Sequence, residues 1–492
     1  MKNLAALGML AFATSAAQAD NFLVTTNSDG GPGSLRQAII DANDAADVPH
    51  TISFSGGLYP TGSSITLVGS LPDIEATDLT IVGGAAAPVI DGGGVFQIMY
   101  ATLTVQKLHL KDIELSNGYS SGVLGQGGAC LGAAGGSGGD LTLERVIFRG
   151  CTLSTTGLAW GAAVRWSRSA GSVDIIDSRF LGNYAEVTTT GQGGGGALSI
   201  AAAHLSIEGS WFENNATIAE DGSANGGAIY VSTSNIHTVW VGDSSFIDND
   251  ASPGRSNGGA GGAIYLSCAD CFVQLERNWF RGNAANTGGA IYMRQGYSSP
   301  NLARLVLNNS SFYNHLVTAS GGAVVVGSNT ELAAGNNSFY SNSASDGAHL
   351  SFSGSADVLA FRANLLAPVG AGAPCSGSPG IAVPGAVRLN VFSDGGCSLL
   401  NNQALPSNDL GSFQLEESSF GNDMSFFWFD GGSVIDAIAD SGACEAGDVL
   451  GNSRPIDGDG DTIARCDVGA FEKYWVLIPP VDAWVFIDGF ED

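Results

Sequence analysis

Hydrophobic and polar positions alternate in short segments through the middle of this chain. In one representative stretch a small residue separates Leu198 from Ile200, and Leu205 and Ile207 repeat the pattern a few positions later. Alternation over a few residues is the period of a β-strand, whereas an amphipathic helix repeats its apolar positions about every three to four residues. The pattern therefore predicts many short strands and an all-β fold.

Two motifs recur in one register along these predicted strands. Gly-Gly-Ala alternates with Phe-x-x-Asn, and Cys151 and His315 stand where two of the asparagines would be. The phenylalanines lie 27 to 34 residues apart and are Phe148, Phe180, Phe212, Phe246, Phe280, Phe312 and Phe339. The asparagines are Asn183, Asn215, Asn249, Asn283 and Asn342. Interleaved motifs at a near-constant period of this length indicate a repeat protein.

Each repeat is interpreted as one turn of a single-stranded parallel β-helix, with glycine or asparagine at the corners, because both tolerate conformations that other residues resist. Successive turns stack at about 4.8 Å. Each phenylalanine should therefore lie over the next, the asparagine amides should hydrogen-bond in a ladder, and the alanine of Gly-Gly-Ala should point inward. The polar stretches 216–225 and 250–260 are predicted to be loops at one corner, where a solenoid can carry its function.

The two ends of the chain depart from the repeat. Ser34 and Gln37 fit a capping box ahead of an amphipathic helix that begins at Leu35, and we expect this helix to cap the open end of the solenoid. The predicted organisation is a signal peptide at 1–19, an N-terminal cap with irregular coils at 20–115, regular repeats at 116–365, C-terminal coils with a β/loop cap at 366–474, and a tail at 475–492.

Several features predict export from the cell. Lys2, an apolar run over residues 4–17 and the small-residue site Ala17-Gln18-Ala19 have the form of a secretory signal. No later stretch reaches the length of a transmembrane helix. The formal net charge of −28 disfavours nucleic acid and anionic membranes as partners.

Eight cysteines fit an oxidising compartment. Eight cysteines allow 105 pairings, so the sequence does not fix their connectivity. Pairing between cysteines near in sequence is the simplest arrangement, and it predicts the bonds Cys130–Cys151, Cys268–Cys271, Cys375–Cys397 and Cys444–Cys466. The Cys268-x-x-Cys271 pair is interpreted as a structural bridge, because no βαβ pattern or further zinc ligand accompanies it.

One acidic segment has the spacing of a calcium loop. Asp457, Asp459 and Asp461 occupy the positions of the first three ligands, but Thr462 and Val468 stand where such a loop has glycine and glutamate. Calcium is thus the one cofactor that the sequence suggests. An acidic, glycine-rich turn without a metal remains the alternative.

An enzyme that cleaves polysaccharides is the main alternative to a binding protein. Hydrolysis of a glycosidic bond needs two carboxylates about 5 to 10 Å apart, and the Asp-Asp, His-Gly and Arg-x-Lys signatures of polygalacturonase-like enzymes are absent from the sequence. A lyase would use a base beside a cation. One mixed-charge group is a candidate, although solvated strand edges and loops explain it more simply: Arg145, Arg149, Arg165, Arg168 and Arg179 with Asp174 and Asp177.

The alternation of Gly-Gly-Ala-Ile with Phe-x-x-Asn over about residues 125–350 resembles the repeats of bacterial polymorphic outer-membrane proteins. Residues 467–472, Asp-Val-Gly-Ala-Phe-Glu, resemble the end of choice-of-anchor domains, and residues 33–38 resemble a start motif of bacterial β-helix proteins. These resemblances imply a right-handed helix, a location at the surface of a Gram-negative-type bacterium and an adhesive role. The C-terminal barrel of those proteins would not fit in the 20 residues after Glu472, so release or another form of attachment is expected.

The sequence therefore favours a secreted or cell-surface β-helix scaffold of the adhesin type, with cell-surface or carbohydrate ligands and no evident catalytic site. The alternative is an extracellular polysaccharide lyase or glycoside hydrolase of the pectin-lyase-like type. A third interpretation is an extracellular structural protein stabilised by calcium.

Overall fold

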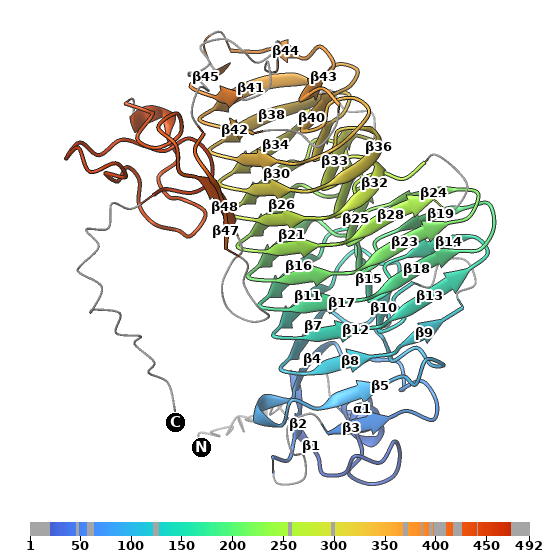
Figure 1. Cartoon of the computed structure of the whole chain (residues 1–492). Coiled ribbons are helices and arrows are strands. Elements are labelled where there is room, and N and C mark those ends of the chain that lie inside the picture. Colours follow the sequence, from blue (N-terminus) through green and yellow to red (C-terminus); the bar gives the residue numbers. More distant parts are fainter. Residues whose placement is uncertain are drawn as a thin grey trace, which may run out of the picture.

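The computed structural model describes residues 20–45, 49–56, 63–121, 127–253, 258–296, 301–367, 372–383, 385, 387–392, 397, 410–416, 426–439 and 441–473. Within these ranges the chain forms a parallel β-solenoid, in which each strand pairs with its equivalents in the turns before and after it (Figure 1). This confirms the predicted all-β solenoid, and its handedness stays a prediction. The predicted signal peptide at 1–19 and tail at 475–492 lie outside the described residues.

Three long parallel sheets run along the solenoid. The fourteen-strand sheet contains β1 (Asn21–Val24), β2 (His50–Phe54), β4 (Asp78–Val82), β7 (Lys107–Lys111), β11 (Asp140–Glu144), β16 (Ser172–Ile176), β21 (His204–Glu208), β26 (Thr238–Gly242), β30 (Phe272–Glu276), β34 (Ala303–Asn308), β38 (Thr330–Gly335), β41 (Asp357–Arg362), β44 (Gly380–Ile381) and β45 (Val387–Arg388). The twelve-strand sheet contains β3 (Ser64–Thr66), β5 (Val89–Asp91), β8 (Glu114–Ser116), β12 (Ile147–Arg149), β17 (Arg179–Leu181), β22 (Trp211–Glu213), β27 (Ser245–Ile247), β31 (Trp279–Arg281), β35 (Ser311–Tyr313), β39 (Ser338–Tyr340), β42 (Leu365–Leu366) and β46 (Val391–Phe392). The ten-strand sheet contains β6 (Met99–Tyr100), β10 (Leu131–Ala133), β15 (Val164–Ser167), β20 (Leu198–Ala201), β25 (Ile229–Thr233), β29 (Ile264–Cys268), β33 (Ile291–Gln295), β37 (Val324–Val326), β40 (Leu350–Phe352) and β43 (Cys375–Ser376).

Shorter sheets and helices complete the described structure. A seven-strand sheet contains β9 (Tyr119–Ser120), β13 (Thr152–Thr155), β18 (Tyr184–Val187), β23 (Ala216–Ala219), β28 (Asp250–Pro253), β32 (Ala284–Thr287) and β36 (Leu316–Ser320). A three-strand sheet contains β14 (Leu158–Trp160), β19 (Gln192–Gly194) and β24 (Ser223–Asn225), and an antiparallel pair contains β47 (Phe413–Glu416) and β48 (Phe426–Phe429). The helices are α1 (Leu35–Asp44) and two 3-10 turns, η1 (Gly84–Ala86) and η2 (Ser441–Ala443).

The recurring phenylalanines form one aromatic ladder inside the solenoid, as predicted. Each ring lies over its equivalent in the next turn at 4.7 to 5.0 Å between centroids, with planes inclined by 1 to 10°. All seven side chains, from Phe148 to Phe339, are fully buried. Stacking at the spacing of the turns therefore fills the interior continuously and leaves no ring in water.

The asparagines form the predicted amide ladder at a corner. The Nδ2 atom of each asparagine donates to Oδ1 of the next at 2.9 Å in the pairs Asn183–Asn215, Asn215–Asn249 and Asn249–Asn283. The two exceptions keep the register: the backbone N–H of Cys151 donates to Asn183, and Nδ1 of His315 accepts from the backbone N–H of Asn283 at 3.0 Å. Burial lowers the pKa of His315 to about 3, so the ring stays neutral.

A second polar ladder was not predicted. From Phe180 to Phe339, the residue two positions before each phenylalanine is serine or asparagine, and Asn364 and Asn390 continue the series. The side chain of each member accepts a hydrogen bond from the backbone N–H of the preceding member. The members are Ser178, Ser210, Ser244, Asn278, Ser310, Asn337, Asn364 and Asn390. Because each turn supplies the acceptor for the turn before it, this corner satisfies its buried backbone donors without water.

Glycine is required at the first position of Gly-Gly-Ala. Gly226 has a φ of +64°, and a Cβ atom there would lie 2.0 Å from the carbonyl oxygen of Ile229. Both facts exclude a larger residue without strain. The alanines that follow, such as Ala228 and Ala263, are fully buried and point inward as predicted.

The predicted corner loops are partly strands, and this expectation was wrong. Residues 216–225 contain β23 and β24, and β28 lies in 250–260. Their polar composition suggested loops, but each backbone pairs with its equivalent in neighbouring turns, so stacking supplies the hydrogen bonds that composition does not reveal. Together these strands extend each turn on one side of the ten-strand sheet (Figure 1).

The N-terminal helix α1 begins where predicted. Ser34 is its N-cap and accepts from the backbone N–H of Gln37 at 3.1 Å, whereas the Gln37 side chain donates to Asp41 and does not return to Ser34. The capping box is therefore only half formed. The buried face of α1 contacts β1 and β2, the first two strands of the fourteen-strand sheet. Its predicted role as a cap stays a prediction.

The described residues between 410 and 473, which we call the C-terminal segment, lie against the side of the twelve-strand sheet (Figure 1). Phe427 packs edge-on against Trp279 of β31, with 6.1 Å between ring centroids. The backbone N–H of Ala470 donates to Ser338 in β39. The described contacts are thus lateral, and the predicted cap over the end of the solenoid stays a prediction.

Candidate functional site

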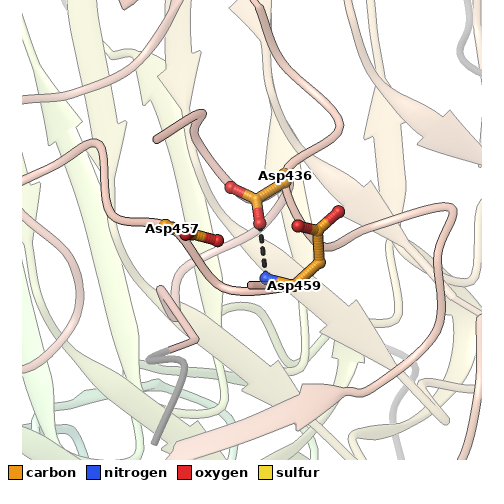
Figure 2. Close-up of side chains that lie close together, drawn as sticks. All are labelled: Asp436, Asp457 and Asp459. Carbon is orange, nitrogen blue, oxygen red and sulfur yellow. Dashed lines mark hydrogen bonds between the residues drawn. The ribbon is translucent and has the colours of Figure 1, made fainter. Parts of the chain in front are cut away.

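The C-terminal segment brings three carboxylates together, but they are not the three that the sequence predicted. Asp436, Asp457 and Asp459 each offer an oxygen within 4.8 Å of the others (Figure 2). Asp461 belongs instead to an ion pair with Arg465, at 2.9 Å between Oδ2 and Nη1. The predicted calcium loop therefore contributes two of its acids, and Asp436 joins them from a distant part of the sequence.

Backbone donors fix these carboxylates. Oδ2 of Asp436 accepts from the N–H groups of Gly458 and Asp459 at 2.7 Å each, and burial raises the pKa of Asp436. The two oxygens of Asp457 accept from Gly460 at 2.6 Å and from Thr462 at 2.9 Å. Figure 2 shows the three side chains facing one another, with the Asp459 N–H directed at Asp436. The loop is thus held in shape by its own carboxylates.

This arrangement offers hard oxygen ligands of the type that calcium prefers. Calcium takes about six to eight oxygens in protein sites, so three carboxylates would need help from backbone carbonyls and water. Hydrogen bonds within the loop also explain the same geometry without a metal. Calcium at Asp457 and Asp459 with Asp436 is therefore a prediction, as is any role for Asp461.

A fully buried ionic group lies in the same segment. The side chains of Arg454 and Glu472 are both inaccessible to solvent, with 3.3 Å between Nε and Oε2, and Arg454 also donates to the carbonyl oxygens of Gly469 and Ala470. Burial, with the nearby Glu472 carboxylate, raises the pKa of Asp467 to about 8. These groups hold the chain together and are too enclosed to meet a ligand.

The four predicted disulfides are the four in the structure: Cys130–Cys151, Cys268–Cys271, Cys375–Cys397 and Cys444–Cys466. Pairing of all eight cysteines indicates an oxidising setting outside the cytoplasm. Among the described residues, no helix is long and apolar enough to cross a membrane.

The predicted arginine group is distributed over different sheets. Arg149 and Arg179 lie in the twelve-strand sheet, Arg165 lies in the ten-strand sheet, and Asp174 lies in the fourteen-strand sheet. Arg149 forms an ion pair with Glu114 at 2.9 Å. These residues are close in sequence, but the sequence alone does not show which sheet of the solenoid each of them occupies.

Two further members of that group have structural partners. Arg145 forms ion pairs with Asp112 and Glu144, and Asp177 lies at the adjoining corner with a φ of +49°. Arg168 is completely buried and donates to the carbonyl oxygens of Gly135, Ala101 and Thr102. Arg168 therefore ties neighbouring turns together and does not face a substrate.

A groove that the sequence analysis missed lies between the ten-strand sheet and the side extension formed by β19 and β24. Its volume is about 360 Å³. Tyr230, Tyr265 and Tyr292 line it from β25, β29 and β33, where they occupy the same register position. Polar side chains complete the lining: Gln192, Ser223, Asn225, Ser232, Thr287 and Arg294.

The tyrosines form a ladder on the outside of the solenoid. Tyr230 and Tyr265, and then Tyr265 and Tyr292, stack at 5.4 Å between ring centroids. Trp160 of β14 extends the ladder against Tyr230 at 4.7 Å. Gly194 makes this contact possible, because a Cβ atom there would lie 2.5 Å from the Tyr230 ring.

A signal for this ladder exists in the sequence. The pentapeptide Gly-Gly-Ala-Ile-Tyr occurs three times, ending at Tyr230, Tyr265 and Tyr292. The alanine of the motif is buried, and side chains alternate between the two faces along a strand. Whether the tyrosine two positions later points inward or outward therefore depends on the corner that lies between the two residues. The corner geometry was needed to resolve this choice.

Comparison of the chain with protein-family models, curated proteins and solved structures finds no match. The resemblances to polymorphic outer-membrane proteins and to choice-of-anchor domains therefore stay predictions. The chain is a disulfide-bonded parallel β-solenoid with an acidic loop and a lateral groove.

Proposed function

We propose that this chain is a secreted or cell-surface β-helix scaffold of the adhesin type, which binds cell-surface or carbohydrate ligands on its lateral face. The observation that carries the proposal is the outer tyrosine ladder. Three tyrosines occupy one register position on successive turns, stack on one another and line a groove of about 360 Å³.

Two further features support this proposal. The disulfides fit an extracellular setting, and the repeat resembles that of bacterial polymorphic outer-membrane proteins, which implies the surface of a Gram-negative-type bacterium. A rigid solenoid also presents a groove in fixed geometry, which lowers the entropy that binding must overcome.

The polysaccharide lyase or hydrolase remains the competing proposal, and the groove chemistry favours binding. Within the described lining there is no carboxylate pair of the kind that hydrolysis requires. The neighbouring Tyr265 phenol raises the pKa of Arg294, so this arginine stays protonated and suits an anion better than the role of a base.

A direct test measures binding and cleavage in parallel. Fluorescently labelled chain is incubated with intact bacterial and epithelial cells, and the unlabelled chain competes with it. Pectate and alginate are incubated with the same preparation and followed for unsaturated ends and reducing sugar. We expect saturable, competable surface binding and no cleavage. Absence of binding, or cleavage that disappears in Arg294→Gln, would overturn the proposed function.

A further inference from the structure

The groove between the ten-strand sheet and β24 has the size of a small-ligand site. Its volume of about 360 Å³ lies within the range of about 300–1,000 Å³ that is usual for such sites. Hydroxyl and amide groups from Ser223, Asn225 and Thr287 line it together with the tyrosines. The lining thus offers many neutral hydrogen-bonding groups and little apolar surface.

The tyrosine ladder presents its rims, and not its faces, to the groove. Both faces of Tyr230 and Tyr265 and one face of Tyr292 are covered by stacked rings, so a sugar cannot insert between the rings of the ladder. Ile229 and Val231, which flank Tyr230, are buried in the core, so Tyr230 projects to the other side of the strand. The ladder therefore directs its ring edges and phenolic hydroxyls to the groove, spaced at the interval of the turns.

Arg294 is the cationic group in this lining. Arg294 lines the groove together with Tyr265, Tyr292 and Tyr230, and the Tyr265 phenol makes the largest contribution to raising the pKa of Arg294. The arginine is exposed and stands two positions after Tyr292 on β33.

The charge of Arg294 is not neutralised within the described part of the chain. No described carboxylate lines the groove, and none forms an ion pair with Arg294. Other arginines on the solenoid have carboxylate partners, such as Arg277 with Asp243 at 2.6 Å and Arg304 with Glu331 at 2.7 Å. In a chain of net charge −28, an arginine left without an acid in a groove is a site for one anionic group.

We propose that this groove binds a short oligosaccharide that contains one acidic sugar, with the sugar carboxylate on Arg294 and the sugar hydroxyls on the tyrosine rims and the lining amides. The inference rests on the proposed function and names its ligand. A long polyanion is disfavoured because the acidic surface of the chain repels it, whereas a single carboxylate meets only the local positive charge.

The test compares acidic oligosaccharides with neutral counterparts by isothermal titration calorimetry. The probes are sialyllactose against lactose and glucuronosyl-xylotriose against xylotriose. At least one acidic probe should bind with a Kd below about 1 mM, and its neutral counterpart should bind at least about tenfold more weakly. Failure of every acidic probe, or equal binding of acidic and neutral partners, would overturn the inference.

Matched variants locate the binding. Arg294→Gln should weaken the acidic probe at least about tenfold and leave the neutral probe unchanged, because only the charge-assisted bond is lost. Arg304→Gln, which removes the same charge from the fourteen-strand sheet, should change neither. Tyr265→Phe should weaken both probes, because it removes a hydroxyl shared by both. An Arg294→Gln variant that binds like the parent chain would show that the carboxylate lies elsewhere.

These outcomes are separable from those of the proposed function. Surface binding that persists although no oligosaccharide binds would leave the scaffold proposal intact and overturn only the ligand assignment. Loss of both would overturn both. Each variant is checked by its melting temperature, so that weakened binding is not mistaken for unfolding.

Discussion

The regular turns of the solenoid and the C-terminal segment bury polar groups in contrasting ways. In the turns, the amide of Asn215 donates to Asn249 and accepts from Asn183, so identical neutral groups satisfy one another. In the C-terminal segment, Arg454 and Glu472 meet only once in the chain and are buried as a charged pair. The regular turns satisfy their buried polar groups by repeating one hydrogen bond, whereas the C-terminal segment satisfies its own by contacts that occur once.

The difference has a physical consequence. A neutral amide ladder requires no desolvation of charge, and each added turn supplies partners for the last one. Buried charges are costly to desolvate and shift their pKa values, so the region that contains them responds to pH. The solenoid should therefore respond most strongly to changes in packing, and the C-terminal segment to changes in charge and ions.

The largest expected effect is on the phenylalanine ladder. Phe246→Ala removes a buried ring between Phe212 and Phe280 and should lower the free energy of unfolding by about 3–5 kcal/mol. Urea denaturation measures this quantity. Phe427→Ala is the matched substitution in the C-terminal segment, and hydrogen exchange should show lost protection mainly in residues 426–473. A cost below about 1 kcal/mol for Phe246→Ala would mean that the ladder does not support the fold.

The second prediction is that the two regions lose stability at opposite ends of the pH scale. His315 has a pKa of about 3 in the folded chain, against about 6.5 when unfolded. The unfolded chain therefore gains a proton first as the pH falls, and the solenoid loses stability between about pH 6.5 and 3. His315→Asn restores the residue type of the ladder and should remove this contribution to acid sensitivity.

The C-terminal segment should instead lose stability as the pH rises. Asp467 has a pKa of about 8 when folded, against about 3.9 when unfolded. The unfolded chain releases its proton first, so the contribution of Asp467 is fully present below about pH 3.9 and is lost as the pH rises to about 8. Hydrogen exchange at pH 5 and pH 9 measures this, and Asp467→Asn should reduce the difference. Equal responses of both regions to pH would contradict the contrast drawn between them.

Repetition also decided how much could be predicted from sequence. The stacking of Phe246 and Asn249 could be inferred because the same residue types recur at one spacing, and identical turns must superimpose. The serine and asparagine ladder through Ser244 carried an equally regular signal that was overlooked. The strands β23 and β28 were missed because their pairing comes from stacked backbones and not from apolar alternation.

Contacts made only once could not be predicted. Asp457 and Asp459 were identified from their spacing, but Asp436 joins them through the fold of the C-terminal segment, and nothing in the local sequence marks it. The same limit applies to Arg168, whose carbonyl partners lie in other turns. The disulfides were predictable because each pair is close in sequence, with a separation of at most 22 residues.

The smallest expected effect is that of calcium on the acidic loop, which should stabilise the C-terminal segment and not the solenoid. If calcium binds with the Kd of about 10⁻⁴–10⁻³ M that is usual for extracellular modules, a few millimolar calcium should stabilise the C-terminal segment by about 1–2 kcal/mol and leave the solenoid unchanged. Asp459→Asn should abolish this gain. Asp461→Asn is the matched control, because Asp461 pairs with Arg465 and lies outside the cluster. A melting temperature that is the same in calcium and in chelator would exclude a calcium site and leave the loop as a turn held by its own carboxylates. Equal loss of the calcium-dependent stabilisation in Asp459→Asn and Asp461→Asn would show that Asp461 is a ligand as well.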